Sequence, residues 1–284
     1  MPSQLHNYPI KIFLADLNHD GHNVKTYPYA VGCIAAYAIK EFGCKVEIDI
    51  FKSSKELIKN LLSNPPHILG FSNYIWNLYL SYDIIKKIKS IYPEMIIVMG
   101  GPNYFEDREE QIKFLKRYDL IDFYIYHEGE IPFIEMLKTL DLYKFNVTSL
   151  KEELRGLPGC HYIYKDTFIA GDEVEKIKDC DSIPSPYLTG IFDKFFKDDR
   201  LVPLMQFSRG CPFSCTFCVE GIKYYNNLGH FSIERFLKEL EYTAQRLKKD
   251  LTLHLADANF GMYKEDINLC KEIAKIQKKY GWPK

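Results

Sequence analysis

The sequence lacks any long apolar run, and this absence bears on where the protein works. No stretch approaches the roughly 20 consecutive apolar residues that a helix needs to cross a bilayer. Residues 1–9 are polar and have no apolar centre of the kind found in secretion signals. These absences predict a cytoplasmic protein that does not span a membrane.

An excess of charge of one sign is also absent. The 37 Lys and Arg residues balance 38 Asp and Glu residues, which gives a net charge of -1. A nucleic-acid-binding protein usually carries a basic patch or stripe, whereas here the two signs are spread evenly along the chain. The sequence therefore argues against a nucleic-acid partner.

The first 140 residues alternate apolar strands with amphipathic helices. The expected strands and helices form five consecutive pairs, at residues 10–15 and 29–42, 45–50 and 54–63, 67–72 and 77–92, 95–99 and 106–118, and 121–126 and 130–140. Five such units predict an α/β domain over residues 1–140, with a doubly wound, five-stranded parallel sheet of the flavodoxin-like kind. Ligands of such sheets bind beyond the carboxyl ends of the strands.

The alternation breaks over residues 141–199. Residues 162–170 read as a small hairpin, and residues 183–186 as an extended connector, because each proline disfavours helical geometry in the residue before it. We predict an interdomain linker with some structure of its own. A second α/β series follows over residues 200–284, with strands and helices expected at residues 201–207, 232–248, 251–256 and 264–280.

Three of the eight cysteines are clustered, namely Cys211, Cys215 and Cys218. Soft thiolate ligands suit iron–sulfur clusters and zinc. Structural zinc normally has four protein ligands, and the nearest candidate for a fourth, His230, lies well beyond the third cysteine. Three cysteines on a four-iron cluster would leave one iron open to a small ligand. The other five read as small buried hydrophobes: Cys33, Cys44, Cys160, Cys180 and Cys270.

The segment from Ser208 to Cys218, with Phe217 directly before the last cysteine, resembles the signature of the radical SAM enzymes. The resemblance implies a 4Fe-4S cluster on the three cysteines and the start of a partial βα (TIM-like) barrel over residues 200–284. It implies that S-adenosylmethionine binds the open iron and is cleaved to a 5′-deoxyadenosyl radical, with Phe217 near its adenine. Asp257 and Asn259, after the second barrel strand, would lie beside S-adenosylmethionine; a plain strand–helix turn is the other reading.

The N-terminal domain is similar to the cobalamin (vitamin B12)-binding domain found before many radical SAM cores. The resemblance rests on Ser72 at the end of the third strand and on Gly100 and Gly101 at the end of the fourth. It implies that these residues lie where the nucleotide tail of cobalamin passes, and Glu128 and Gly129 after the fifth strand also match. A Gly-Gly pair after a strand can equally be a turn.

Two features of this domain leave alternatives open. Histidine-ligating cobalamin domains carry Asp-x-His-x-x-Gly after the first strand, whereas residues 16–21 here read Asp-Leu-Asn-His-Asp-Gly. His19 or His22 would either ligate cobalt or be a solvated loop histidine. Tyr74 and Trp76 would either flank the corrin ring or belong to the core.

Together these patterns predict a radical SAM enzyme, with cobalamin-dependent methyl transfer among the reactions left open. A reductant such as flavodoxin or ferredoxin and a small-molecule or peptide substrate are its expected partners. The alternatives are a non-catalytic cobalamin-binding or sensing module whose cysteines hold structural zinc, and an inactive fragment. A radical SAM barrel usually has six strand–helix units, and only two are visible here, so we expect the chain to be part of a longer protein.

Overall fold

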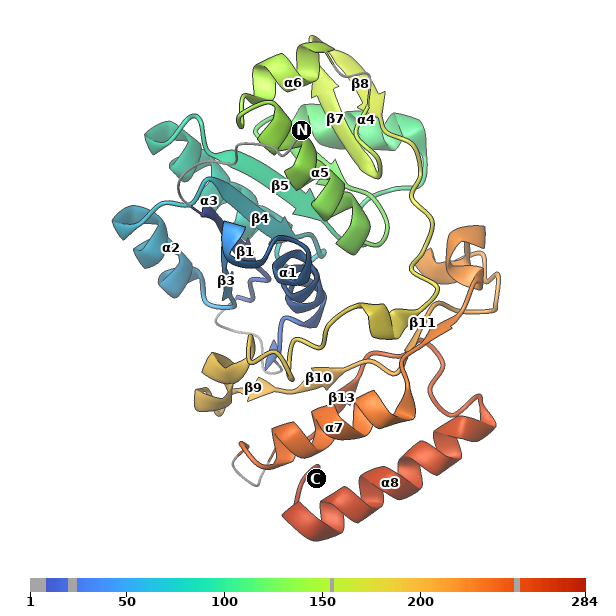
Figure 1. The fold of residues 1–284 in the computed structure, drawn as a ribbon. Coiled ribbons are helices and arrows are strands. Elements are labelled where there is room, and N and C mark those ends of the chain that lie inside the picture. Colours follow the sequence, from blue (N-terminus) through green and yellow to red (C-terminus); the bar gives the residue numbers. More distant parts are fainter. Residues whose placement is uncertain (1–8, 20–24, 154–155, 248–250) are drawn as a thin grey trace. The chain divides into compact units, whose positions relative to one another are not determined.

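The computed structural model describes residues 9–19, 25–153, 156–247 and 251–284. Contacts divide the chain into two compact units (Figure 1), one of Met1–Gly21 with Tyr37–Glu175 and one of His22–Ala36 with Lys176–Lys284. Among the described residues, no helix combines the length and apolar character that crossing a membrane requires.

The first unit is built on one seven-stranded sheet with the order β3-β1-β4-β5-β6-β7-β8. The first five strands in that order are parallel, and the last two are antiparallel to their neighbours. The predicted five-stranded parallel sheet is therefore confirmed. The strands are β1 (Ile10–Ala15), β3 (Val46–Phe51), β4 (Ile68–Ser72), β5 (Ile96–Gly100), β6 (Phe123–Ile125), β7 (Cys160–Tyr164) and β8 (Thr167–Ala170).

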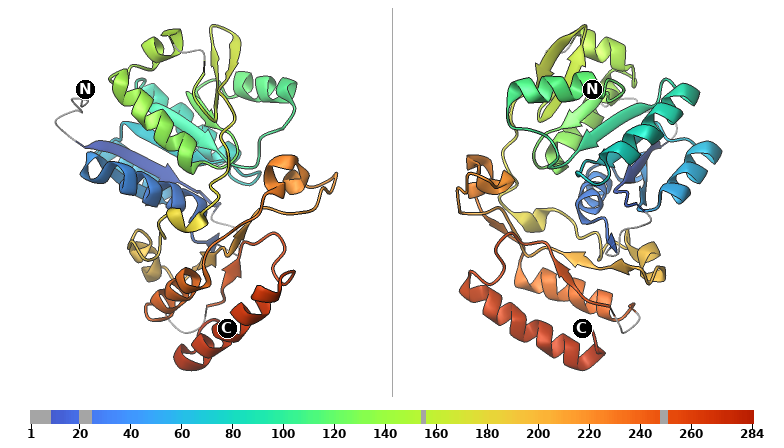
Figure 2. Two further views of the ribbon diagram at one scale, coloured as in Figure 1. Left: turned by 45° about the vertical axis from the view of Figure 1, so that its right-hand side comes forward. Right: turned by 180° about the vertical axis from the view of Figure 1, so that it is seen from behind.

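Helices cover both faces of this sheet, as continuously buried strands require. In Figure 2, α5 lies on the face opposite α2 and α3. Side chains of α2, α3 and α4 share one hydrophobic core cluster with β1, β4 and β5. The helices are α2 (Ser54–Ser63), α3 (Leu78–Ile91), α4 (Arg108–Arg117), α5 (Glu130–Leu142) and α6 (Val147–Glu153), and α1 (Tyr29–Phe42) is divided between the two units after Ala36.

The hairpin predicted within a linker belongs to the sheet instead. Strands β7 and β8 extend the sheet from β6, with Tyr124 opposite His161 and Ile125 opposite Cys160. Residues 141–175 are thus part of the first unit, whereas residues 176–199 pack within the second. The expected linker over residues 141–199 is divided between the two units.

The described residues of the second unit include three short strand pairs and the helices α7 and α8. Strand β10, helix α7 and strand β13 follow one another in the chain, and the two strands pair in parallel. They form the βαβ unit expected at the start of a βα barrel. The expected single strand at residues 201–207 is interrupted at Pro203, which has no N–H to donate. The elements are β2 (Lys25–Thr26), β9 (Leu201–Val202), β10 (Leu204–Met205), β11 (Ser208–Arg209), β12 (Gly229–His230), α7 (Ile233–Ala244), β13 (His254–Leu255) and α8 (Lys264–Tyr280).

Aromatic packing ties an early segment of the chain to this unit. Tyr27 is buried, and its ring centroid lies 6.0 Å from that of Tyr187 and 5.7 Å from that of Phe192. The neighbouring β2 pairs with β9 in parallel. Residues near the start of α1 therefore belong to the second unit, although they precede most of the first in sequence.

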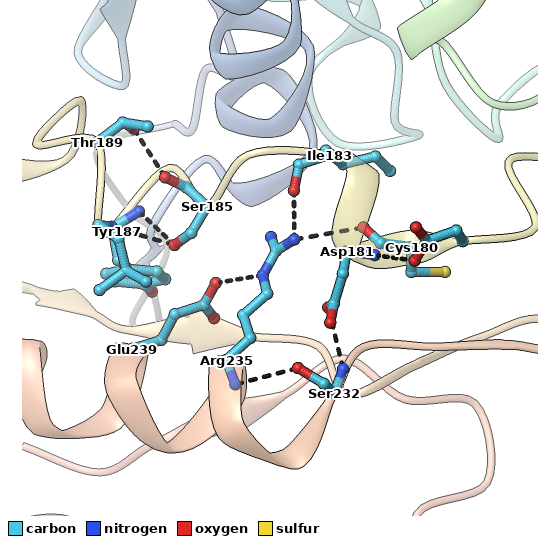
Figure 3. A network of polar contacts seen from close by, with 11 residues as sticks. Cys180, Asp181, Ile183, Ser185, Tyr187, Thr189, Ser232, Arg235 and Glu239 are labelled. Carbon is cyan, nitrogen blue, oxygen red and sulfur yellow. Dashed lines mark hydrogen bonds and ion pairs between the residues drawn. The ribbon is translucent and has the colours of Figure 1, made fainter.

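A polar network holds the segment before β9 against α7 (Figure 3). Arg235 donates hydrogen bonds to the carbonyl oxygens of Cys180, at 3.3 Å, and of Ile183, and pairs with the Glu239 carboxylate at 3.0 Å. The backbone N–H of Ser232 donates to the Asp181 carboxylate at 3.0 Å. The Ser232 hydroxyl also caps α7.

Candidate functional site

The residues predicted to contact cobalamin all lie at the carboxyl edge of the first unit's sheet. Ser72, the last residue of β4, is the register partner of Gly100, the last residue of β5. The segment of Glu128 and Gly129 follows the next strand, β6, and Gly129 precedes the first turn of α5. The structure thus brings these residues to the edge where ligands of open parallel sheets bind.

A buried polar network lies beside Ser72. The Ser72 hydroxyl donates to the Asp16 carboxylate at 2.7 Å and accepts from the Asn77 amide at 3.2 Å. Lys52, with a side chain only 7% exposed, pairs with the other Asp16 oxygen at 2.6 Å. Sequence reasoning missed Lys52, although a lysine directly after a buried strand was a usable signal.

Gly101 meets the chain's own backbone closely. Its φ of +133° lies in a region that favours glycine, and a Cβ atom there would be 2.6 Å from the Asn73 carbonyl oxygen. The buried Asn73 is in turn fixed, because its amide donates to the Asn103 carbonyl at 2.7 Å and to the Tyr124 hydroxyl at 3.0 Å. The glycine is thus required for the turn, whether or not a ligand passes beside it.

We expect Gly101→Ala to destabilise the protein by about 3 kcal/mol or more, since it combines an unfavourable φ with a backbone clash. The matched control is Gly43→Ala, at a φ of +57° with no atom within 4 Å of the added Cβ, where strain alone costs about 1 kcal/mol. Urea unfolding of both variants measures the difference. Equal losses would contradict the importance of the Asn73 contact.

Aromatic side chains near this edge are exposed. The Trp76 ring stacks on the Tyr74 ring, with centroids 4.6 Å apart and planes 6° apart, and Trp76 is 44% exposed. Trp76 is therefore not a core residue. Tyr74 is more buried, and this burial raises the pKa of its hydroxyl to about 12. Ile75 and Tyr79 are also exposed.

Two histidines, His19 and His22, are the candidates for cobalt ligation, and a third, His127, lies at the same edge. His19 is exposed, and His22 lies outside the described residues. His127, which follows β6, has a φ of +65° and a mostly buried side chain between Glu106 at 3.5 Å and Glu173 at 3.4 Å. Burial lowers the pKa of His127 despite these carboxylates.

The cysteine loop of the second unit follows β11 directly. Cys211 is buried, with its N–H donating to the Tyr225 carbonyl at 2.9 Å, whereas Cys215 and Cys218 are exposed. Phe217 between them is 92% exposed. Within the described ranges, no three His, Cys, Asp or Glu side chains are grouped so as to hold a metal ion. The three thiols fit an iron–sulfur cluster as a donor set, and their ligand role stays a prediction.

The loop after β13 contacts the start of the cysteine loop. The Asp257 carboxylate accepts hydrogen bonds from the N–H of Phe207 at 3.0 Å and from the Ser208 hydroxyl at 2.6 Å. Burial raises the pKa of Asp257 despite these donors. The Asn259 amide donates to the Cys211 sulfur at 3.0 Å. The structure therefore brings both residues to the cysteine loop, and their predicted contact with S-adenosylmethionine stays a prediction.

Comparisons with known proteins agree with this arrangement. The model of the B12 binding domain matches residues 2–137. A cobalamin-dependent radical SAM methyltransferase, TokK of Streptomyces tokunonensis, is 29% identical over 77% of this chain and 31% of its own length. The 2-(S-pantetheinyl)-carbapenam-3-carboxylate methyltransferase of Streptantibioticus cattleyicolor is 30% identical over the same shares of the two chains.

A solved structure shares the fold. The cobalamin-dependent S-adenosylmethionine radical enzyme OxsB, with aqua-cobalamin and S-adenosylmethionine bound, aligns with a TM-score of 0.64 at 22% identity. The alignment covers 95% of this chain and 37% of that one. The chain thus spans about a third of the length of the relatives it matches.

Proposed function

We propose that this chain binds cobalamin and serves radical SAM methyl transfer, because the B12 binding domain model matches residues 2–137 and the chain is similar to cobalamin-dependent radical SAM methyltransferases. The observation that carries the proposal is the presence of two candidate sites in one chain. A B12-binding domain is followed by a βαβ unit with a three-cysteine loop at its first strand.

In this proposal the first unit holds cobalamin at the carboxyl edge of its sheet. Gly100 and Gly101 would lie beside the nucleotide tail, with Ser72 and the segment of Glu128 and Gly129 on either side. The exposed Trp76 ring, supported by Tyr74, would be one of the residues that hold the corrin ring. Cobalamin supplies a carrier for the transferred methyl group.

The second unit would hold a 4Fe-4S cluster on Cys211, Cys215 and Cys218. Such a cluster supplies the electron that cleaves S-adenosylmethionine to a 5′-deoxyadenosyl radical. The exposed Phe217 would then cover the adenine, with Asp257 fixing the loop that carries it. A flavodoxin or ferredoxin as reductant and a small molecule or peptide as substrate belong to the same proposal.

Electron paramagnetic resonance tests this function on anaerobically reconstituted, dithionite-reduced protein, with and without S-adenosylmethionine. We expect a four-iron signal that changes shape when S-adenosylmethionine is added, together with iron and sulfide in the purified chain. Absorbance after incubation with hydroxocobalamin and gel filtration measures cobalamin retention. Zinc without iron would instead support a non-catalytic cobalamin-binding module, and absence of retained cobalamin would contradict the role of the first unit.

A further inference from the structure

One cysteine of the loop differs from the other two in its surroundings. Cys211 is 9% exposed, whereas Cys215 and Cys218 are exposed. The Asn259 side chain reaches Cys211 from the loop after β13, and its amide nitrogen lies 3.0 Å from the sulfur. This sulfur therefore has a specific hydrogen-bond donor, which comes from a residue 48 positions away in sequence.

The position of Asn259 is fixed by its neighbours in the chain. Two residues earlier, the Asp257 carboxylate binds the backbone N–H groups of Phe207 and Ser208, which precede the cysteine loop. The N–H of Met262 donates to the Asn259 carbonyl at 3.2 Å. The loop after β13 is thus tied to the start of the cysteine loop, so the amide is oriented before any cluster binds.

We infer that Asn259 is a positioning residue that hydrogen-bonds the Cys211 thiolate and raises the reduction potential of the cluster. The inference rests on the proposed function, because it requires the cluster. A hydrogen bond to a cluster sulfur favours the reduced state, whose extra electron makes the sulfur more negative. This role differs from the contact with S-adenosylmethionine that the sequence predicts for Asn259.

The test is a redox titration of the reconstituted chain, with the cluster signal measured by electron paramagnetic resonance. In Asn259→Ala we expect the ratio of reduced to oxidised cluster at a given potential to fall about tenfold, a shift of about 59 mV for one electron. The control is Asn226→Ala, because the Asn226 amide donates to the carbonyl oxygen of Cys211, at 3.1 Å. Its potential should remain close to that of the unmodified protein.

The outcomes separate the two proposals. A chain without substitutions that forms no cluster contradicts the proposed function. A cluster whose potential is unchanged in Asn259→Ala, or shifts equally in Asn226→Ala, overturns the role of Asn259 alone. Asn259→Leu keeps a side chain of similar size and removes the donor without adding a charge, so it repeats the test if the alanine variant loses the cluster. If both Asn259 variants lose the cluster while Asn226→Ala retains it, Asn259 is required for cluster assembly. That outcome would overturn its inferred effect on the reduction potential.

Discussion

Cys215→Ser is expected to abolish cluster assembly and, with it, any cleavage of S-adenosylmethionine. Two thiolates would remain, and a serine hydroxyl is a poor substitute for a soft thiolate on iron. Because Cys215 is exposed, the substitution should change the free energy of unfolding by about 0.5 kcal/mol or less. Iron and sulfide content after reconstitution, with 5′-deoxyadenosine formation by chromatography, measures the loss.

The matched control is Cys270→Ser. Cys270 lies on α8 in the same unit and is exposed, so its substitution also places a hydroxyl in solvent. Cys160 is a poorer control, since it is fully buried and burial raises the pKa of its thiol to about 12. A serine there would bury a hydroxyl and cost folding energy. Equal loss of iron in Cys215→Ser and Cys270→Ser would show general damage instead of ligand loss.

Local patterns in the sequence predicted the helices and parallel strands well. Apolar spacing gave the bounds of α1, α2 and α8 as the structure has them, because each helix carries its own apolar face and end signals. The place of the β7–β8 hairpin was not predictable in this way. Its turn is visible in the sequence, but its pairing with β6 depends on residues some distance away. The same holds for Tyr27, whose partners follow the whole first unit.

The candidate site shows the same contrast between local signals and contacts that join distant segments. The cysteine spacing and the Gly100-Gly101 pair are local signals, and they fall directly after β11 and at the end of β5. The pairing of Lys52 with Asp16 and the contact of Asn259 with Cys211 join segments from different strand ends. Only the fold decides which polar residues meet there, so the sequence revealed neither the pairing of Lys52 nor the contact of Asn259 with Cys211.

Arg235→Leu is expected to destabilise the protein by about 3–5 kcal/mol at neutral pH. The Arg235 and Glu239 side chains are 10% and 2% exposed, so the substitution leaves a buried carboxylate without its cation. It also removes the donor to the Ile183 and Cys180 carbonyl oxygens, which holds the segment before β9 against α7 (Figure 3). Urea unfolding at pH 7 measures the change in the free energy of unfolding.

The pH dependence tells the two causes of this loss apart. Burial raises the pKa of Glu239 even though Arg235 lowers it, so removing Arg235 raises that pKa further. A carboxyl group whose pKa is raised on folding loses stability as pH rises through its folded pKa. The deficit of Arg235→Leu should therefore be largest at pH 7–8 and shrink below about pH 4.3, the ordinary pKa of a glutamate. The double variant Arg235→Leu/Glu239→Leu should recover part of the stability and lose this pH dependence. A deficit independent of pH would instead assign the loss to the carbonyl contacts, because those do not titrate.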